Sequence, residues 1–196
     1  MASRDMMIVR HRINTIAELR KVPRDEGVEV DIRECRGEPC LAHDPYEKGG
    51  MLKQFLSYYR HRWIIFNPKC DGLEGKILKL AAEFSIKKFF LLDVAIPTLV
   101  KLTNQKISKI AVRFSEYEPI ESCLGFAGKA EWVWVDCFTK FLLNRKNYPL
   151  LKKHFKICLV SPELQGHPVS WIQKYKNNCS LFPVDAVCTD HPTLWQ

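Results

Sequence analysis

The sequence of 196 residues lacks any apolar run near the roughly 18 to 20 residues that a membrane-spanning helix needs. The first residues, MASRDMMIVRHRIN, break a very short apolar stretch with charges, which is not typical of a secretory signal. Low-complexity segments, charged tails and linkers are also missing. We therefore expect a cytoplasmic protein without a transmembrane segment, with a single domain over residues 1–196.

None of the eight cysteines forms a C-x-x-C motif, so the chain has no spacing that supports a zinc site. Most of the cysteines lie in apolar segments. A disulfide framework is possible by count, but a chain of this size does not need one. We expect reduced, buried thiols.

Basic residues are numerous but never form a run longer than two, and the net charge is +8. This charge favours a small anionic ligand. The basic positions are scattered and carry no aromatic nucleic-acid motif, so we expect no nucleic-acid partner.

Short apolar, β-branched or aromatic runs alternate with stretches of helical spacing along the chain. The runs typical of strands are 6–10, 28–32, 63–67, 88–93, 109–114, 132–136, 156–161 and 184–189. Helices are expected near 14–22, 50–60, 73–84, 97–104, 119–127, 143–154 and 168–178. We expect Asp71 to cap the third of these helices. The order predicts an α/β fold, a compact (β/α)8 TIM barrel.

An open, doubly wound sheet is the alternative architecture, but no glycine-rich loop follows the first predicted strand. Polar residues also recur where the predicted strands end, which is the face where barrel enzymes build their active sites. These residues are His11, Arg12, Glu29, Asp31, Asn67, Lys69, Asp93, Arg113, Asp136, Glu163 and Asp190.

Glu29 and Asp31 lie two positions apart on a predicted strand, so both side chains point to the same face. The alternate positions Val28, Val30 and Ile32 then point towards the helices. Two carboxylates forced together repel unless one is protonated or a cation lies between them. Mg²⁺ and Ca²⁺ prefer oxygen ligands of this kind, although a solvent-facing acidic edge explains the pattern equally well.

Two histidines flank this acidic strand in the sequence. His11 and Arg12 end the first predicted strand, and His43 follows a predicted hairpin with a turn at 36–37. Paired histidines beside a metal could serve as general base and general acid. Arg12 and Lys69 could hold a phosphate. We assign no role to the remaining histidines, which are His61, His154, His167 and His191.

Taken together, "HRINT" (11–15), "GVEVDI" (27–32) and "LAHDP" (41–45) resemble the glycerophosphodiester phosphodiesterase superfamily. That family has H-R-G…N-T, then E-x-D, then H-D. "VDAVCTDHP" (184–192) is similar to the family's last strand. The resemblance implies a (β/α)8 barrel, like that of the phosphatidylinositol phospholipases C, and metal-assisted cleavage of a phosphodiester.

The resemblance also implies three groups of site residues. They are His11 and His43 as the acid/base pair, Glu29, Asp31 and Asn67 as ligands of one divalent cation (Mg²⁺ or Ca²⁺), and Arg12 and Lys69 as the phosphate-binding pair. The implied substrate is a glycerophosphodiester, or a glycan or lipid headgroup in phosphodiester linkage.

The sequence departs from the family pattern at three points. Asn67 stands where the family places an acidic ligand, so the site would offer two negative charges rather than three. Ile13 replaces the glycine of H-R-G, and residues 45–62 leave no room for the insertion that roofs typical members. The chain resembles a short bacterial branch of the family. A lyase that releases a cyclic phosphate and a phospho-ligand-binding barrel without turnover are the alternatives.

Overall fold

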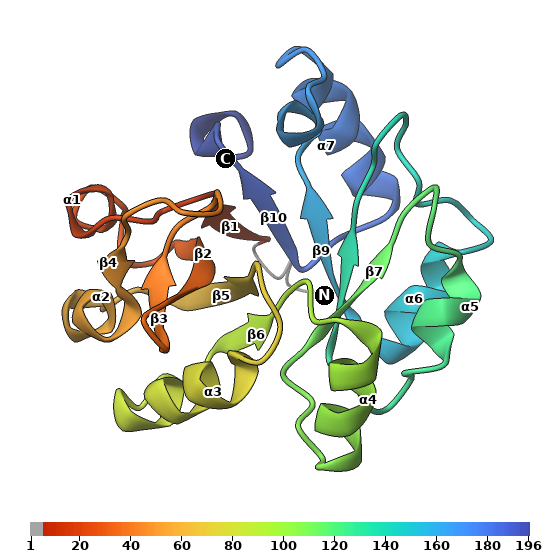
Figure 1. Ribbon diagram of the computed structural model, residues 1–196. Helices are drawn as coiled ribbons and strands as arrows, with labels where there is room; N and C mark the ends of the chain where they lie inside the picture. Colours follow the sequence, from red (N-terminus) through yellow and green to blue (C-terminus); the bar gives the residue numbers. More distant parts are fainter. Residues whose placement is uncertain (1–5) are drawn as a thin grey trace.

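Eight parallel strands form the barrel of this protein, whose computed structural model describes residues 6–196 (Figure 1). The strands are β1 (Met7–Arg10), β2 (Gly27–Cys35), β5 (Trp63–Pro68), β6 (Phe89–Leu91), β7 (Ala111–Phe114), β8 (Trp132–Val135), β9 (Lys156–Val160) and β10 (Ala186–Thr189). Parallel pairing of β10 with β1, and one isolated bridge between Leu91 and Ile110, complete the ring. All eight predicted strands and the barrel are confirmed. Residues 1–5, which belong to the predicted domain, lie outside the described residues.

Helices surround the strands (Figure 1). They are α1 (Ile16–Leu19), α2 (Leu52–Tyr58), α3 (Glu74–Glu83), α4 (Ile96–Asn104), α5 (Ile120–Leu124), α6 (Tyr148–His154) and α7 (Trp171–Leu181), with short 3₁₀ turns η1 (Pro162–Gln165) and η2 (Pro192–Leu194). The turn η2 stands where a last barrel helix would follow β10. No helix within residues 6–196 has both the length and the apolar character needed to cross a bilayer.

The ends of two helices show how local sequence places them. Thr15 and Glu18 form a reciprocal capping box at the start of α1, which fixes the chain just after the first strand. The predicted cap of α3 is wrong: the helix begins after Leu73, and Asp71 does not cap it. Gly72 has a φ of +91° and donates its N–H to Glu74, so a carboxylate inside the helix binds the loop instead.

Apolar side chains fill two layers, one on each side of the strands. Val28, Val30 and Ile32 are fully buried in the layer between strands and helices, as predicted. A second cluster fills the barrel itself, where Trp132 packs against Phe90 with ring centroids 5.1 Å apart. The polar side chains at the strand ends therefore stand on a rigid, packed base.

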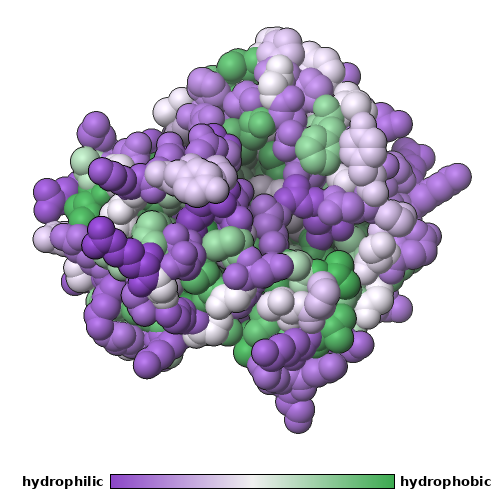
Figure 2. Space-filling model, in the orientation of Figure 1, coloured by the Kyte–Doolittle hydropathy of each residue, from purple (hydrophilic) through white to green (hydrophobic). Residues whose placement is uncertain are grey.

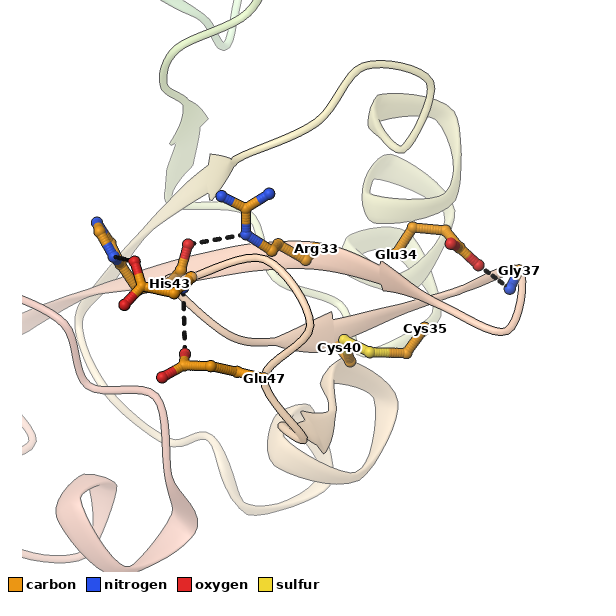
Figure 3. The surroundings of a disulfide bond; sticks show 8 residues. Arg33, Glu34, Cys35, Gly37, Cys40, His43 and Glu47 are labelled. Carbon is orange, nitrogen blue, oxygen red and sulfur yellow. Dashed lines mark hydrogen bonds and ion pairs between the residues drawn. A yellow bond between two sulfur atoms is a disulfide. The ribbon is translucent and has the colours of Figure 1, made fainter.

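Beyond the barrel rim, β2 continues into an antiparallel hairpin with β3 (Glu38–Leu41), and β3 pairs with β4 (Gly50–Met51). The predicted turn is confirmed, because Arg36 and Gly37 both have positive φ, at +54° and +83°. Cys35 and Cys40 form a disulfide across the hairpin (Figure 3). The expectation that all thiols are reduced is therefore wrong. The other cysteines, at 70, 123, 137, 158, 179 and 188, are free.

The hairpin register explains the disulfide. Cys35 is opposite Glu38, and Cys40 is opposite Arg33, so both cysteines lie on one face of the ribbon with Cα atoms 5.8 Å apart. Figure 3 shows the disulfide near the tip of the hairpin, away from His43. It braces the ribbon that leads to this histidine. Because reducing compartments disfavour such bonds, the cytoplasmic location stays a prediction.

Candidate active site

Polar side chains from the strand ends gather around a cavity of about 250 Å³ at the mouth of the barrel. This is the face at which barrel enzymes carry their active sites. Its polar lining residues are His11, Arg12, Glu29, Asn67, Lys69, Asp93, Arg113, Asp136 and Gln165. Most of the polar strand-end residues singled out in the sequence therefore meet in one place.

Glu29 and Asp31 form the buried floor of this site. Both side chains come from β2, and each residue is only 1% exposed. Asn67 on β5 lies beside Asp31 in the parallel register and is 5% exposed. Burial and the neighbouring Asp31 raise the pKa of Glu29 above its usual range. Two buried carboxylates in contact are costly unless a cation or hydrogen-bond donors compensate them.

Asn67 provides part of this compensation. Its amide Nδ2 donates to Glu29 Oε1 at 2.8 Å and, more weakly, to Asp31 Oδ1 at 3.4 Å. The amide oxygen of Asn67 is buried and has no hydrogen-bond partner. A half-turn about the Cβ–Cγ bond exchanges the two amide atoms, so the oxygen would then face both carboxylates.

This donor set fits one hard divalent cation. Two carboxylates and an amide oxygen are the ligand types that Mg²⁺ and Ca²⁺ prefer, and the unpaired oxygen of Asn67 supplies the third donor after the half-turn. Across residues 6–196, no group of three or more His, Cys, Asp or Glu side chains is arranged to hold a metal. The cation would therefore depend on the amide of Asn67.

Two positively charged side chains, those of Arg12 and Lys69, lie against the same floor. Arg12 has a φ of +52°, donates its backbone N–H to Glu29 at 2.9 Å, and places its guanidinium Nε 3.8 Å from Asp31. Lys69 Nζ lies 3.2 Å from Asp31 and 3.6 Å from Asp93. Both cationic groups thus border the cavity at a distance suited to an anionic ligand.

Each of the two predicted catalytic histidines is held at Nδ1 by an aspartate. His11 Nδ1 lies 3.1 Å from Asp190, and His43 Nδ1 lies 2.7 Å from Asp44. The guanidinium of Arg12 donates to His43 Nε2 at 2.6 Å. Because a guanidinium only donates, this Nε2 is the acceptor of the hydrogen bond, while Nδ1 faces Asp44. The arrangement orients His43 as a proton acceptor.

Comparison with solved structures shows which proteins share this fold. No family model matches the chain, and no curated protein matches it in sequence. A glycerophosphoryl diester phosphodiesterase from Parabacteroides distasonis superposes with a TM-score of 0.68 at 10% identity, covering 100% of this chain and 86% of that one. A glycerophosphodiester phosphodiesterase from Agrobacterium tumefaciens gives 0.64 at 14% identity and covers 97% of both chains. The chain has the fold of the glycerophosphodiester phosphodiesterases.

A second structure from Agrobacterium tumefaciens, described as a putative glycerophosphoryl diester phosphodiesterase, gives a TM-score of 0.66 at 12% identity and covers 97% of this chain. The glycerophosphodiester phosphodiesterase fold therefore spans the chain, and the barrel implied by the motif resemblance is confirmed. At such low identity the likeness concerns architecture, and the chemistry has to be argued from the side chains of this chain.

One predicted catalytic residue, His43, does not line the cavity at the barrel mouth. His43 lines an adjoining hollow with Arg12 and Asn14, and Arg12 is the residue common to both hollows. Arg33 holds the loop that carries His43, donating to the His43 carbonyl at 2.8 Å (Figure 3). His43 is therefore positioned from the hairpin, beside the cavity lined by His11.

Sequence reasoning assigned no role to three residues that orient this site. Asn14 donates to Asp31 at 2.9 Å and accepts the Asp31 backbone N–H at 2.8 Å. Asp190 and Asp44 hold the two histidines. The signal for Asn14 was present in the "HRINT" segment, and that for Asp44 in the H-D pair. Only the barrel closure, which places β10 beside β1, brings Asp190 to His11.

The far wall of the cavity carries a second charge network around Arg113. This guanidinium pairs with Asp93 and Asp136, and lies 3.7 Å from Glu118. Burial would lower the pKa of Arg113, but the three carboxylates outweigh this effect and raise it. Gln165 donates to Asp136 at 2.5 Å. Because three carboxylates face one guanidinium, this wall carries an excess of negative charge, whereas Arg12 and Lys69 match the two carboxylates of the floor in number.

Proposed function

We propose that this protein hydrolyses a phosphodiester with the help of a bound divalent cation, using His11 and His43 as an acid/base pair. The observation that carries the proposal is the pair of imidazoles held at Nδ1 by aspartates. Arg12 lies on Nε2 of His43 and would free this nitrogen on turning to the phosphate of the substrate. The buried floor of Glu29 and Asp31 lies close to both, because Arg12 contacts this floor and His43 alike.

In this proposal, the phosphate group of the substrate binds against Arg12 and Lys69. The guanidinium of Arg12 and the ammonium of Lys69 face Asp31 in the structure, and in the complex they would face the phosphate oxygens. One imidazole takes the proton of the attacking hydroxyl or water, and the other protonates the oxygen of the departing alcohol. Asp44 and Asp190 keep both rings oriented and stabilise each imidazolium as it forms.

Glu29, Asp31 and the amide oxygen of Asn67 would hold the cation, Mg²⁺ or Ca²⁺. When bound, it supplies positive charge that offsets the charge developing on the phosphate oxygens. The same cation would offset the burial and the repulsion from Asp31 that together raise the pKa of Glu29. A small phosphodiester suits the cavity better than a nucleic-acid strand does, because the cavity measures about 250 Å³.

One observation favours a second function, a phospho-ligand-binding barrel without turnover. The amide nitrogen of Asn67 already bridges the two carboxylates, so the floor can be satisfied without a cation. The two oriented histidines favour the enzyme, because a binding protein has no need of proton-transfer groups.

The test is hydrolysis of glycerophosphodiesters and aryl phosphodiesters in the presence of Mg²⁺, Ca²⁺ or Mn²⁺, and again with EDTA. We expect cation-dependent turnover that falls by at least about a hundredfold in His11→Ala and in His43→Ala. His154→Ala is the matched control, because this exposed histidine ends α6 outside the site.

Phosphorus NMR of the product separates hydrolysis from the lyase alternative, since a monoester marks the first and a cyclic diester the second. Turnover that survives both site substitutions would refute the assigned roles. Binding of a phosphodiester without turnover, in any of the three cations, would favour the binding barrel.

A further inference from the structure

The barrel wall is parted between β6 and β7. These two strands share only the isolated bridge between Leu91 and Ile110, whereas every other neighbouring pair of barrel strands is in register over at least two positions. At the bridge, Leu91 donates its N–H to Lys109, and β6 then ends, whereas β7 continues to Phe114 with β8 as its only paired strand within residues 6–196. The wall therefore opens towards the carboxyl ends of β6 and β7, at the same end as the candidate active site.

A cavity of about 470 Å³ occupies this opening. Leu92 and Ala111 line it and belong to the cluster that fills the barrel. Leu99 and Val112 also line it and belong to the layer between strands and helices. The cavity thus lies where the wall parts, next to α4 and α5.

The walls of this opening are mainly apolar. They are formed by Leu92, Val94, Ala95, Ile96, Leu99, Ala111, Val112, Pro119 and Phe126, together with the polar residues Asp93, Arg113, Tyr117, Glu118 and Ser122. Ile96 is 62% exposed and Tyr117 is 76% exposed. Figure 2 shows hydrophobic surface gathered over the region of α4, in an otherwise largely hydrophilic face. Large apolar side chains left in water at the rim of a hollow are typical of a ligand groove.

The apolar cavity adjoins the phosphate site. Leu92, Asp93 and Arg113 line both cavities. The ion pair between Asp93 and Arg113 stands at the junction, and Lys69 Nζ is 3.6 Å from Asp93. A ligand whose phosphate lies against Lys69 would therefore direct a substituent past this ion pair and into the opening.

We infer that the substrate is a phosphodiester bearing one aliphatic chain, such as a monoacyl or alkyl phospholipid, and that the opening between β6 and β7 receives the chain. This inference rests on the proposed function for the position of the phosphate. The chain is favoured over a second polar group because the charged residues of the opening already pair with one another around Arg113, whereas burial of each methylene against the apolar walls is favourable. The volume is within the range of pockets that bind drug-sized ligands.

Binding is tested first without catalysis, by calorimetry in EDTA with methyl phosphocholine and a series of alkyl phosphocholines below their micelle concentrations. We expect affinity to rise by up to about fourfold per added methylene and then level off when the cavity is full. Ser122→Trp fills the cavity edge from α5 and should weaken long-chain binding at least about tenfold, without changing the methyl compound.

Two further variants keep this test independent of misfolding. Glu121→Trp adds the same ring to the neighbouring exposed position, which does not line the cavity, and should bind like the wild type. Ile96→Asp places a charge at the exposed rim where α4 begins, a position that tolerates an acidic residue, and should flatten the dependence on chain length.

Turnover of a glycerophosphodiester and its monoacyl counterparts is measured next with the wild type and Ser122→Trp. If Ser122→Trp loses turnover of the monoacyl substrates and keeps turnover of the glycerophosphodiester, the inference is supported. Binding that does not depend on chain length, or equal effects of Ser122→Trp and Glu121→Trp, would overturn it. Chain-dependent binding with no hydrolysis of any diester supports the apolar site and refutes the proposed function. Hydrolysis at a rate that does not depend on the aliphatic chain supports the proposed function and refutes the apolar site.

Discussion

Replacing Asn67 by aspartate tests whether the floor of the site is built around a cation. The Asn67 amide donates to Glu29 at 2.8 Å and lies 3.4 Å from Asp31, and all three residues are almost fully buried. Asn67→Asp removes the donor and puts a third carboxylate in its place. Without a cation, we expect the variant to be less stable than the wild type, and with a cation we expect most of this loss to be recovered.

The magnitude follows from the geometry. A negative charge 3.4 Å from the Asp31 oxygen costs about 5 kcal/mol at an effective dielectric constant of about 20. Protonation of one carboxyl at pH 7 avoids this repulsion and costs about 4 kcal/mol, which sets the upper limit of the loss. The corresponding fall in melting temperature is roughly 8 to 16 °C. A cation at about one hundred times its dissociation constant returns about 2.7 kcal/mol.

Thermal unfolding in EDTA, Mg²⁺ and Ca²⁺ measures both effects. Asn67→Leu is the matched control, because it also loses the hydrogen bond to Glu29 but adds no charge. It should melt below the wild type in every buffer, and the cations should not restore it. A variant Asn67→Asp that is as stable as the wild type in EDTA, and indifferent to both cations, would refute the arrangement of Glu29, Asp31 and Asn67 around one ion.

Three further substitutions test other parts of the structure. Lys69→Met should raise KM for a phosphodiester about tenfold or more, because a cation beside the cavity is lost, and an unchanged KM in steady-state kinetics would contradict phosphate binding at this position. Cys35→Ser should lower the free energy of unfolding by about 2 kcal/mol in urea under oxidising conditions, with no difference from the wild type once both are reduced. Burial would raise the pKa of Glu116, but hydrogen bonds from Thr139 and Phe138 outweigh it and lower the pKa. Glu116→Gln should therefore be less stable than the wild type at neutral pH, and urea titrations should show the gap closing as the pH falls through the carboxyl range, whereas a gap that is constant with pH would contradict this.

The barrel could be predicted from the sequence because its signal repeats. Each strand is a short apolar run and each helix a periodic one, so errors at one element do not change the architecture. The errors fell where backbone conformation decides the outcome. Asp71 has the residue type of a cap, but the positive φ of Gly72 turns the chain so that Glu74 binds the loop. The disulfide depends on the register of β2 with β3, which is fixed by the turn that precedes Cys40.

The parted wall between β6 and β7 had no signal in the sequence. Both strands have the composition of ordinary buried strands, and their runs of apolar residues resemble those of the other barrel strands. What separates them is pairing: β6 ends at Leu91, whereas β7 continues to Phe114 with β8 as its only paired strand in the described part of the chain. Asp93, with a φ of +55°, then reaches Arg113 on β7 through its side chain. Pairing between distant segments is a property of the assembled ring, so only the structure reveals the apolar opening that we assign to the substrate chain.

The role of Asn67 marks the limit of what residue type can decide. An amide carries a donor and an acceptor of nearly equal size, and its environment selects which of them faces the carboxylates. In the structure the donor faces Glu29 and Asp31, and the oxygen is left buried without a partner, which costs about 1 to 3 kcal/mol. A cation between the carboxylates would reverse that preference, because the oxygen would gain a ligand bond and the nitrogen would no longer be needed. The free energy of cation binding would therefore include the difference between two orientations of one side chain, and substitution of Asn67 is the direct way to measure it.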